Sequence, residues 1–148
     1  MLTIIAAVLA LAPVQEAPER LALTGFSSDG VMFVDMANVR REGDLVRLRT
    51  YLVPAPGENQ TDSEWTYIGI TCDDPTVQDF GYMSLNAQGE VIRDERVDTV
   101  RQILPLSSDM IFWRTHEQVC ADYPTTVTFN QGEAYRWAKA LLESGFHE

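Results

Sequence analysis

Hydrophobic and polar positions alternate most clearly between residues 45 and 53. In an extended chain Arg47 and Arg49 fall on one face of this stretch, whereas Val46 and Leu48 fall on the other. The pattern therefore predicts a strand with one side toward solvent and one side toward a core.

Other β-prone runs flank this strand. They span residues 21–26, 31–35, 65–72, 80–85 and 91–97. The first two are separated by a turn ending at Gly30 and the last two by a turn ending at Gly89, and glycine favours such turns because it accepts positive φ. In the run 65–72, Tyr67 falls on one face and Cys72 on the other, aliphatic face. We expect an antiparallel sheet of about six strands.

The spacing of apolar residues becomes helical in the last third of the chain. Ser108 has the chemistry of an N-cap, and the helix that it begins is expected to end near Cys120. Asn130 and Glu133 form a capping-box pattern that begins a second helix, and Gly145 ends it. The order of elements predicts an α+β fold in which two C-terminal helices pack on one face of the sheet.

The chain begins with an uncharged apolar run, residues 2–12. This run has the length of a signal-peptide core and is too short to span a membrane, so we expect a signal peptide over residues 1–12 that is cleaved after Ala10 or Ala12. The alternative is a buried first helix or strand of a cytosolic protein. Residues 13–148 have the size of one domain.

The chain contains two cysteines, Cys72 and Cys120. In an exported protein they are most simply explained as one disulfide, which would join a helix end to the aliphatic face of the sheet. In the alternative interpretation, His116 lies one helical turn before Cys120 and activates its thiol.

Acidic residues outnumber basic ones by 22 to 11, which gives a net charge of -11. Nucleic acids, heparin-like polyanions and anionic membranes are therefore not expected as partners. The sequence contains no recognised catalytic, phosphate-binding or calcium-loop motif, so we predict a protein that is not an enzyme and needs no cofactor or metal. We interpret Asp73, Asp74 and Asp79 as a solvated acidic turn, and a cation site at these residues is the minor alternative.

Aromatic residues are numerous along the predicted strands. Large rings serve as core or as binding surface. If Tyr67 and Tyr82 lie on the sheet face away from the helices, they form a candidate interaction surface with Arg47 and Arg49 beside them.

Several spaced residues carry a family resemblance. The pattern consists of an aspartate-ended strand at 31–35 followed by residues 39–43, Trp65 seven residues before Cys72, and Pro105 and Ser108 leading a helix that ends at Cys120. It resembles the surface-adhesin protein E family of small exported bacterial proteins and covers roughly residues 21–120. The resemblance implies an antiparallel sheet with helical packing and a cysteine pair.

These observations predict an exported module, periplasmic or secreted, that binds a protein or another envelope or extracellular ligand. Two alternatives stay open: a periplasmic envelope accessory or inhibitor protein, and an enzyme whose site has no recognised motif. An enzyme predicts a deep polar pocket with converging charges, whereas a binding module predicts an open, shallow face.

Overall fold

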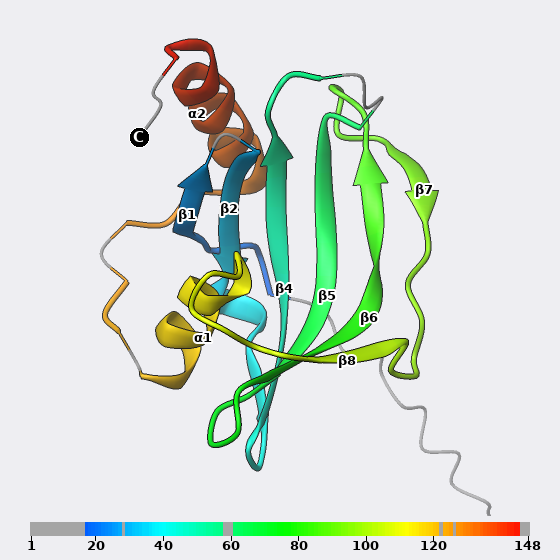
Figure 1. Ribbon diagram of the computed structural model, residues 1–148. Helices are drawn as coiled ribbons and strands as arrows, with labels where there is room; N and C mark the ends of the chain where they lie inside the picture. The colour runs from blue at the N-terminus through cyan, green and yellow to red at the C-terminus, as the bar shows by residue number, and fades with distance from the viewer. Residues whose placement is uncertain (1–16, 28, 58–60, 122, 126, 146–148) are drawn as a thin grey trace, which may run out of the picture.

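The computed structural model describes residues 17–27, 29–57, 61–121, 123–125 and 127–145 (Figure 1). The predicted signal peptide lies outside these residues. The strands are β1 (Leu21–Ser27), β2 (Gly30–Asp35), β3 (Arg40–Glu42), β4 (Leu45–Pro54), β5 (Ser63–Thr71), β6 (Thr76–Leu85), β7 (Val91–Asp94) and β8 (Gln102–Pro105). The helices are the short 3-10 turn η1 (Met36–Asn38), α1 (Phe112–Cys120) and α2 (Gln131–Glu143).

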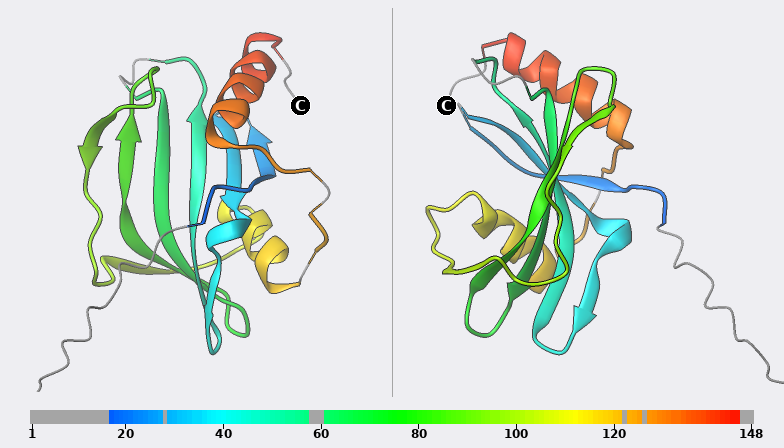
Figure 2. Two further views of the ribbon diagram at one scale, coloured as in Figure 1. Left: turned by 180° about the vertical axis from the view of Figure 1, so that it is seen from behind. Right: turned by 90° about the vertical axis from the view of Figure 1, so that its right-hand side faces the viewer.

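All strand pairs are antiparallel, and the main path through the sheet runs β1-β2-β4-β5-β6-β7. Beside this path β3 pairs with β4 and β8 pairs with β6. The sheet is strongly twisted, and α1 and α2 lie toward opposite ends of its strands (Figures 1 and 2). The predicted α+β class with an antiparallel sheet and two C-terminal helices is confirmed.

The two helices pack on opposite faces of the sheet. Ala134 and Ala138 of α2 join a buried cluster with Phe33 of β2, while Val119 of α1 joins a second cluster with Val34, the next residue of the same strand. Because consecutive residues of a strand point to opposite faces, the helices cannot share a face. We call the two sides the α2 face and the α1 face.

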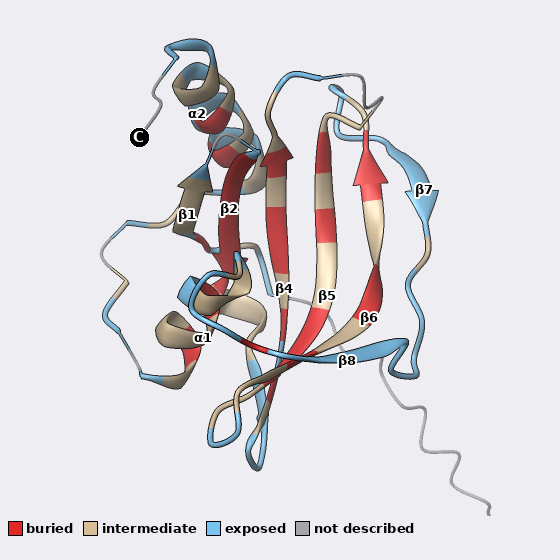
Figure 3. Cartoon of the chain, viewed as in Figure 1, coloured by how far each residue is buried: buried red, intermediate tan, exposed pale blue. Residues whose placement is uncertain are grey.

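The prediction that both helices cover one face is therefore wrong, and the reason lies in β2. Every residue of this strand is buried (Figure 3), as expected for a strand that is covered on both sides. By contrast, β7 and β8 at the far edge of the sheet are exposed throughout.

Helix α2 begins as the sequence predicts. The Asn130 side chain accepts a hydrogen bond from the Glu133 backbone N–H at 2.9 Å, and the Glu133 carboxylate accepts one from the Asn130 N–H at 3.0 Å. This reciprocal capping box satisfies two of the N–H groups that a helix start leaves free. The small side chains of Ala134 and Ala138 let the helix approach Phe33 and Tyr51 of the sheet.

Helix α1 begins later than predicted. Ser108 is not its N-cap: turns in which the Met110 N–H bonds to Ser107 O and the Trp113 N–H bonds to Met110 O precede a helix start at Phe112, where no side chain caps the helix. Ser107 instead donates a short hydrogen bond to Asp109. The predicted end of the helix at Cys120 is confirmed.

Cys72 and Cys120 form the predicted disulfide, with their Cα atoms 5.6 Å apart. It joins the end of α1 to the turn that follows β5. Since neither cysteine is free, the alternative of a thiol activated by His116 is overturned. The His116 ring instead stacks on Trp113, with 5.1 Å between ring centroids. Within the described ranges, no helix has the length and hydropathy needed to cross a bilayer.

Candidate functional site

A bulge in β6 determines which side chains reach each face. Thr66 of β5 pairs with Tyr82 and Ile68 pairs with Asp79, so the single residue between them on β5 faces two residues on β6. One of these is Gly81, which has a φ of 92°. A Cβ atom at this position would lie 2.1 Å from the carbonyl oxygen of Glu95, so only glycine fits.

The bulge places Phe80 and Tyr82 on opposite faces of the sheet. In a regular strand, residues i and i+2 such as these would lie on the same face. Phe80 lies on the α2 face, where its ring borders Gly69 so closely that a Cβ atom there would be 3.3 Å from Phe80 Cε2. The Arg47 guanidinium covers the ring at 4.6 Å from the ring centroid, and Arg47 Nε also donates to Glu42 at 3.2 Å. The buried Phe80 ring therefore forms a floor on this face, and the Arg47 guanidinium lies over it in a cation–π contact.

The segment after β7 forms a wall beside this floor. The N–H of Val97 bonds to the carbonyl of Phe80 at 3.0 Å, which holds the segment against the bulge. Arg96 donates to both carboxylate oxygens of Asp94, at 2.8 Å from Nε and 2.6 Å from Nη2. Its guanidinium lies 5.4 Å from the centroid of the Tyr67 ring.

This ion pair changes the titration of both groups. Hydrogen bonds from the Arg96 side chain and backbone lower the pKa of Asp94 to about 2. The same pairing raises the pKa of Arg96. Both groups are therefore charged at all physiological pH values.

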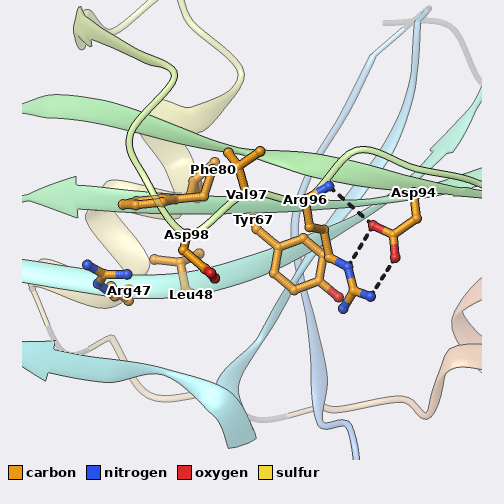
Figure 4. A pocket seen from close by; sticks show the side chains of 9 residues that line it. Arg47, Leu48, Tyr67, Phe80, Asp94, Arg96, Val97 and Asp98 are labelled. Carbon is orange, nitrogen blue, oxygen red and sulfur yellow. Dashed lines mark hydrogen bonds and ion pairs between the residues drawn. The ribbon is translucent and has the colours of Figure 1, made fainter.

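Together these groups line an open cleft of about 720 Å³ on the α2 face (Figure 4), which we call the Arg47 cleft. Its lining residues are Arg47, Leu48, Tyr67, Ile68, Phe80, Asp94, Arg96, Val97 and Asp98. The described residues that line it include no serine, threonine, cysteine or histidine. Two rings, two guanidinium groups and two carboxylates provide contacts for binding, with polar groups of both signs at the rim.

Of the predicted surface residues, the structure brings Arg47 and Tyr67 into this cleft. Arg49 shares their face but its side chain is only 11% exposed, because its Nε donates to the buried Asp35 at 2.8 Å and its guanidinium lies 4.3 Å from the centroid of the Trp65 ring. Arg49 is therefore part of the packing between strands.

Tyr82 is on the α1 face and does not reach the Arg47 cleft. It lines a second cleft of about 480 Å³ with Glu64, Ser84 and Arg93, among others. Alternation in the sequence alone would place Tyr82 on the same face as Phe80. It therefore cannot show that Tyr67 and Tyr82 lie on opposite faces. Gly81 between the two rings is the signal in the sequence for the bulge that does so.

Arg96 and Asp94 were not predicted as site residues, because the sequence around them is typical of a charged, exposed strand end. The alternative cation site at Asp73, Asp74 and Asp79 gains no support: within the described ranges no group of three or more carboxylate, histidine or cysteine side chains is placed to hold a metal ion. Asp79 instead accepts a hydrogen bond from the Gly81 N–H at 2.7 Å, which helps to hold the bulge.

The same fold occurs in a solved bacterial protein. No family model matches this sequence, and no curated protein matches it in a sequence search. Its fold resembles that of Haemophilus influenzae protein E. One structure of that protein superimposes with a TM-score of 0.52 at 12% identity, covering 77% of this chain and 92% of that one. A second structure of protein E, in crystal form II, gives a TM-score of 0.51 at 13% identity. It covers 79% of this chain and 98% of the protein E chain.

The likeness to protein E extends over almost the whole of that chain, so the resemblance read from spaced residues in the sequence is confirmed at the level of the fold. At this low identity the likeness concerns the fold alone, and the function has to be argued from the clefts of this chain.

Proposed function

We propose that this protein is an exported, non-enzymatic module that binds a protein or another ligand of the cell envelope or extracellular space through the Arg47 cleft. The observation that carries the proposal is the cleft itself, in which Tyr67 and Arg96 stand beside the Arg47–Phe80 pair on a sheet face that α2 covers elsewhere. Aromatic rings and arginines are the side chains most enriched at the energetic centres of protein interfaces.

Three features support export. The Cys72–Cys120 disulfide is typical of proteins from oxidising compartments. The apolar run at residues 2–12 has the length of a signal-peptide core. The resemblance to the surface-adhesin protein E family favours the same location and a role in binding.

Partner capture with cleft variants tests the binding role. The tagged mature protein is incubated with periplasmic extract and, separately, with concentrated growth medium, and bound proteins are quantified by mass spectrometry. We expect a partner whose recovery falls at least tenfold with Tyr67→Ala or Arg96→Ala, since truncation of a central interface residue costs about 2 kcal/mol or more.

Two matched variants control for the loss of a ring or a charge. Tyr123→Ala and Arg114→Ala remove exposed side chains that do not line the Arg47 cleft, and both should retain the partner. Recovery that is equal for the cleft variants and the controls would contradict the proposal. A partner found in the periplasmic extract alone would favour an accessory or inhibitor role within the envelope.

A further inference from the structure

The second cleft, on the α1 face, has its own chemistry. Its centre is Glu64 of β5, which pairs across the sheet with Ser84 of β6. Tyr82 and Arg93 line the same cleft, and the exposed side chain of Ile92 forms an apolar border. We call it the Glu64 cleft.

The Glu64 carboxylate is held by hydroxyl groups. Thr66 Oγ1 donates to one of its oxygens at 3.3 Å, and Ser84 Oγ donates to the other at 3.4 Å. In the part of the chain that the structure describes, no arginine or lysine forms an ion pair with Glu64. Burial raises the pKa of Glu64, and the charge of Asp79 adds to this effect, while the two hydroxyl donors oppose it.

The basic side chain that lines the cleft is engaged elsewhere. Arg93 donates from Nε to Glu95 at 2.6 Å, and its guanidinium lies 5.7 Å from the centroid of the Tyr82 ring. The positive charge of Arg93 is thus balanced by Glu95, whereas no described residue that lines the cleft balances the negative charge of Glu64. A half-buried carboxylate of this kind is stabilised most by a cation that also donates hydrogen bonds to it.

We propose that the Glu64 cleft binds an aliphatic primary ammonium group. An ammonium carries three N–H donors, and the cleft offers oxygen acceptors of three kinds in the Glu64 carboxylate, the Ser84 hydroxyl and the Tyr82 hydroxyl. The carbon chain of such a ligand has Ile92 to pack against. A net charge of -11 raises the local concentration of cations around the molecule.

Both a free amine and a lysine side chain present this group. The inference does not rest on the Arg47 cleft, because the two clefts have no lining residue in common and lie on opposite faces. Failure of either proposal therefore leaves the other standing.

The test is a titration of isotope-labelled protein with butylammonium, observed by NMR at the side-chain carboxyl of Glu64 and the amides of Glu64 and Ser84. Butanol serves as the uncharged ligand of similar shape. We expect saturable shifts with butylammonium and none with butanol. Linear shifts without saturation, or equal shifts with butanol, would overturn the proposal.

Two substitutions with the same charge change separate a site from diffuse attraction. Glu64→Gln removes the proposed charge and should weaken butylammonium binding at least tenfold. Glu143→Gln removes an exposed carboxylate at the end of α2 and should leave binding within twofold. If the two variants weaken binding equally, the attraction is diffuse and the proposal fails.

A third substitution is expected to increase the affinity for butylammonium. Arg93→Gln removes a positive charge that lines the cleft and repels a bound cation, so it should strengthen butylammonium binding. Unchanged or weaker binding would contradict the assigned geometry. Blocked peptides containing one lysine or one norleucine then identify the source. Saturation with the lysine peptide assigns the site to a protein side chain, and saturation with butylammonium alone assigns it to a free amine.

Discussion

Arg49 donates a hydrogen bond to Asp35 at 2.8 Å between the central strands β4 and β2. The Asp35 side chain is completely buried and also accepts from the Asn38 amide at 2.7 Å and from the Arg20 N–H at 3.1 Å. This arginine shares a face with the Arg47 cleft, but its contacts make it part of the framework that supports the cleft.

Removing one partner of this pair should destabilise the fold. We expect Arg49→Ala to lower the free energy of unfolding by about 3–5 kcal/mol, because it leaves the buried Asp35 carboxylate without its cation. Urea denaturation measures the loss. The control is Arg47→Ala, which removes an exposed arginine two positions away on the same face of the same strand. It should lower the free energy of unfolding by less than about 1 kcal/mol. Similar losses for the two variants would contradict the structural role of Arg49.

Gly81 should tolerate no side chain. Gly81→Ala places a Cβ atom against the Glu95 carbonyl in a backbone conformation that favours glycine, so we expect a loss of about 2–4 kcal/mol in urea denaturation. Gly57→Ala, where a Cβ atom meets no atom closer than 3.9 Å, is the matched control. A stable Gly81→Ala protein with unchanged amide shifts at Tyr82 would show that the bulge does not need glycine.

The disulfide should contribute a large share of the stability. Its closure restricts a stretch of 48 residues in the unfolded chain, for which the entropy model gives about 4 kcal/mol. Reduction, or Cys72→Ser with Cys120→Ser, should therefore lower the urea midpoint strongly.

Intact mass, measured before and after reduction and alkylation of protein from separate cell fractions, tests the compartment as well. We expect loss of the first 10 or 12 residues and thiols that alkylate only after reduction. A full-length cytosolic protein with two free thiols would contradict export.

Glu64→Gln should stabilise the protein at neutral pH. Because burial raises the pKa of Glu64 in the folded state, the folded protein binds this proton more tightly than the unfolded chain does. The stability associated with the protonated form is complete below the ordinary pKa of 4.5 and is lost as the pH rises through the higher folded value. The variant cannot ionise, so it should exceed the wild type in stability at pH 7 and lose this advantage below pH 4.5, as urea denaturation at both pH values will show.

The sequence correctly predicted those elements whose structure depends on neighbouring residues in the chain. The alternation around Arg47 gave β4, and the pair Asn130 and Glu133 gave the start of α2, because strand period and helix capping are local properties. The side of the sheet on which a helix packs depends on contacts between distant segments. The continuous apolar run of β2 indicates burial on both faces, but it does not identify which helix covers each one.

The candidate surface was predicted in part for the same reason. Arg47 and Tyr67 belong to strands in regular register, so alternation places them on one face. The position of Tyr82 depends on a bulge held by the approach of Glu95, a residue fourteen positions beyond Gly81 in the chain, and no strand period contains that information.

The bulge at Gly81 also has a mechanical consequence. Thr66 and Tyr67 are neighbours on β5 that point to opposite faces of the sheet. On β6, Phe80 lines the Arg47 cleft and Tyr82 lines the Glu64 cleft. Occupants of the two clefts cannot collide, since the sheet itself separates them. Any influence of one occupant on the other would have to be transmitted as a shift of the shared backbone of β5 and β6. The ladder between these strands is locally disrupted at the bulge, so the bulge is where such a shift would pass from one side of the sheet to the other.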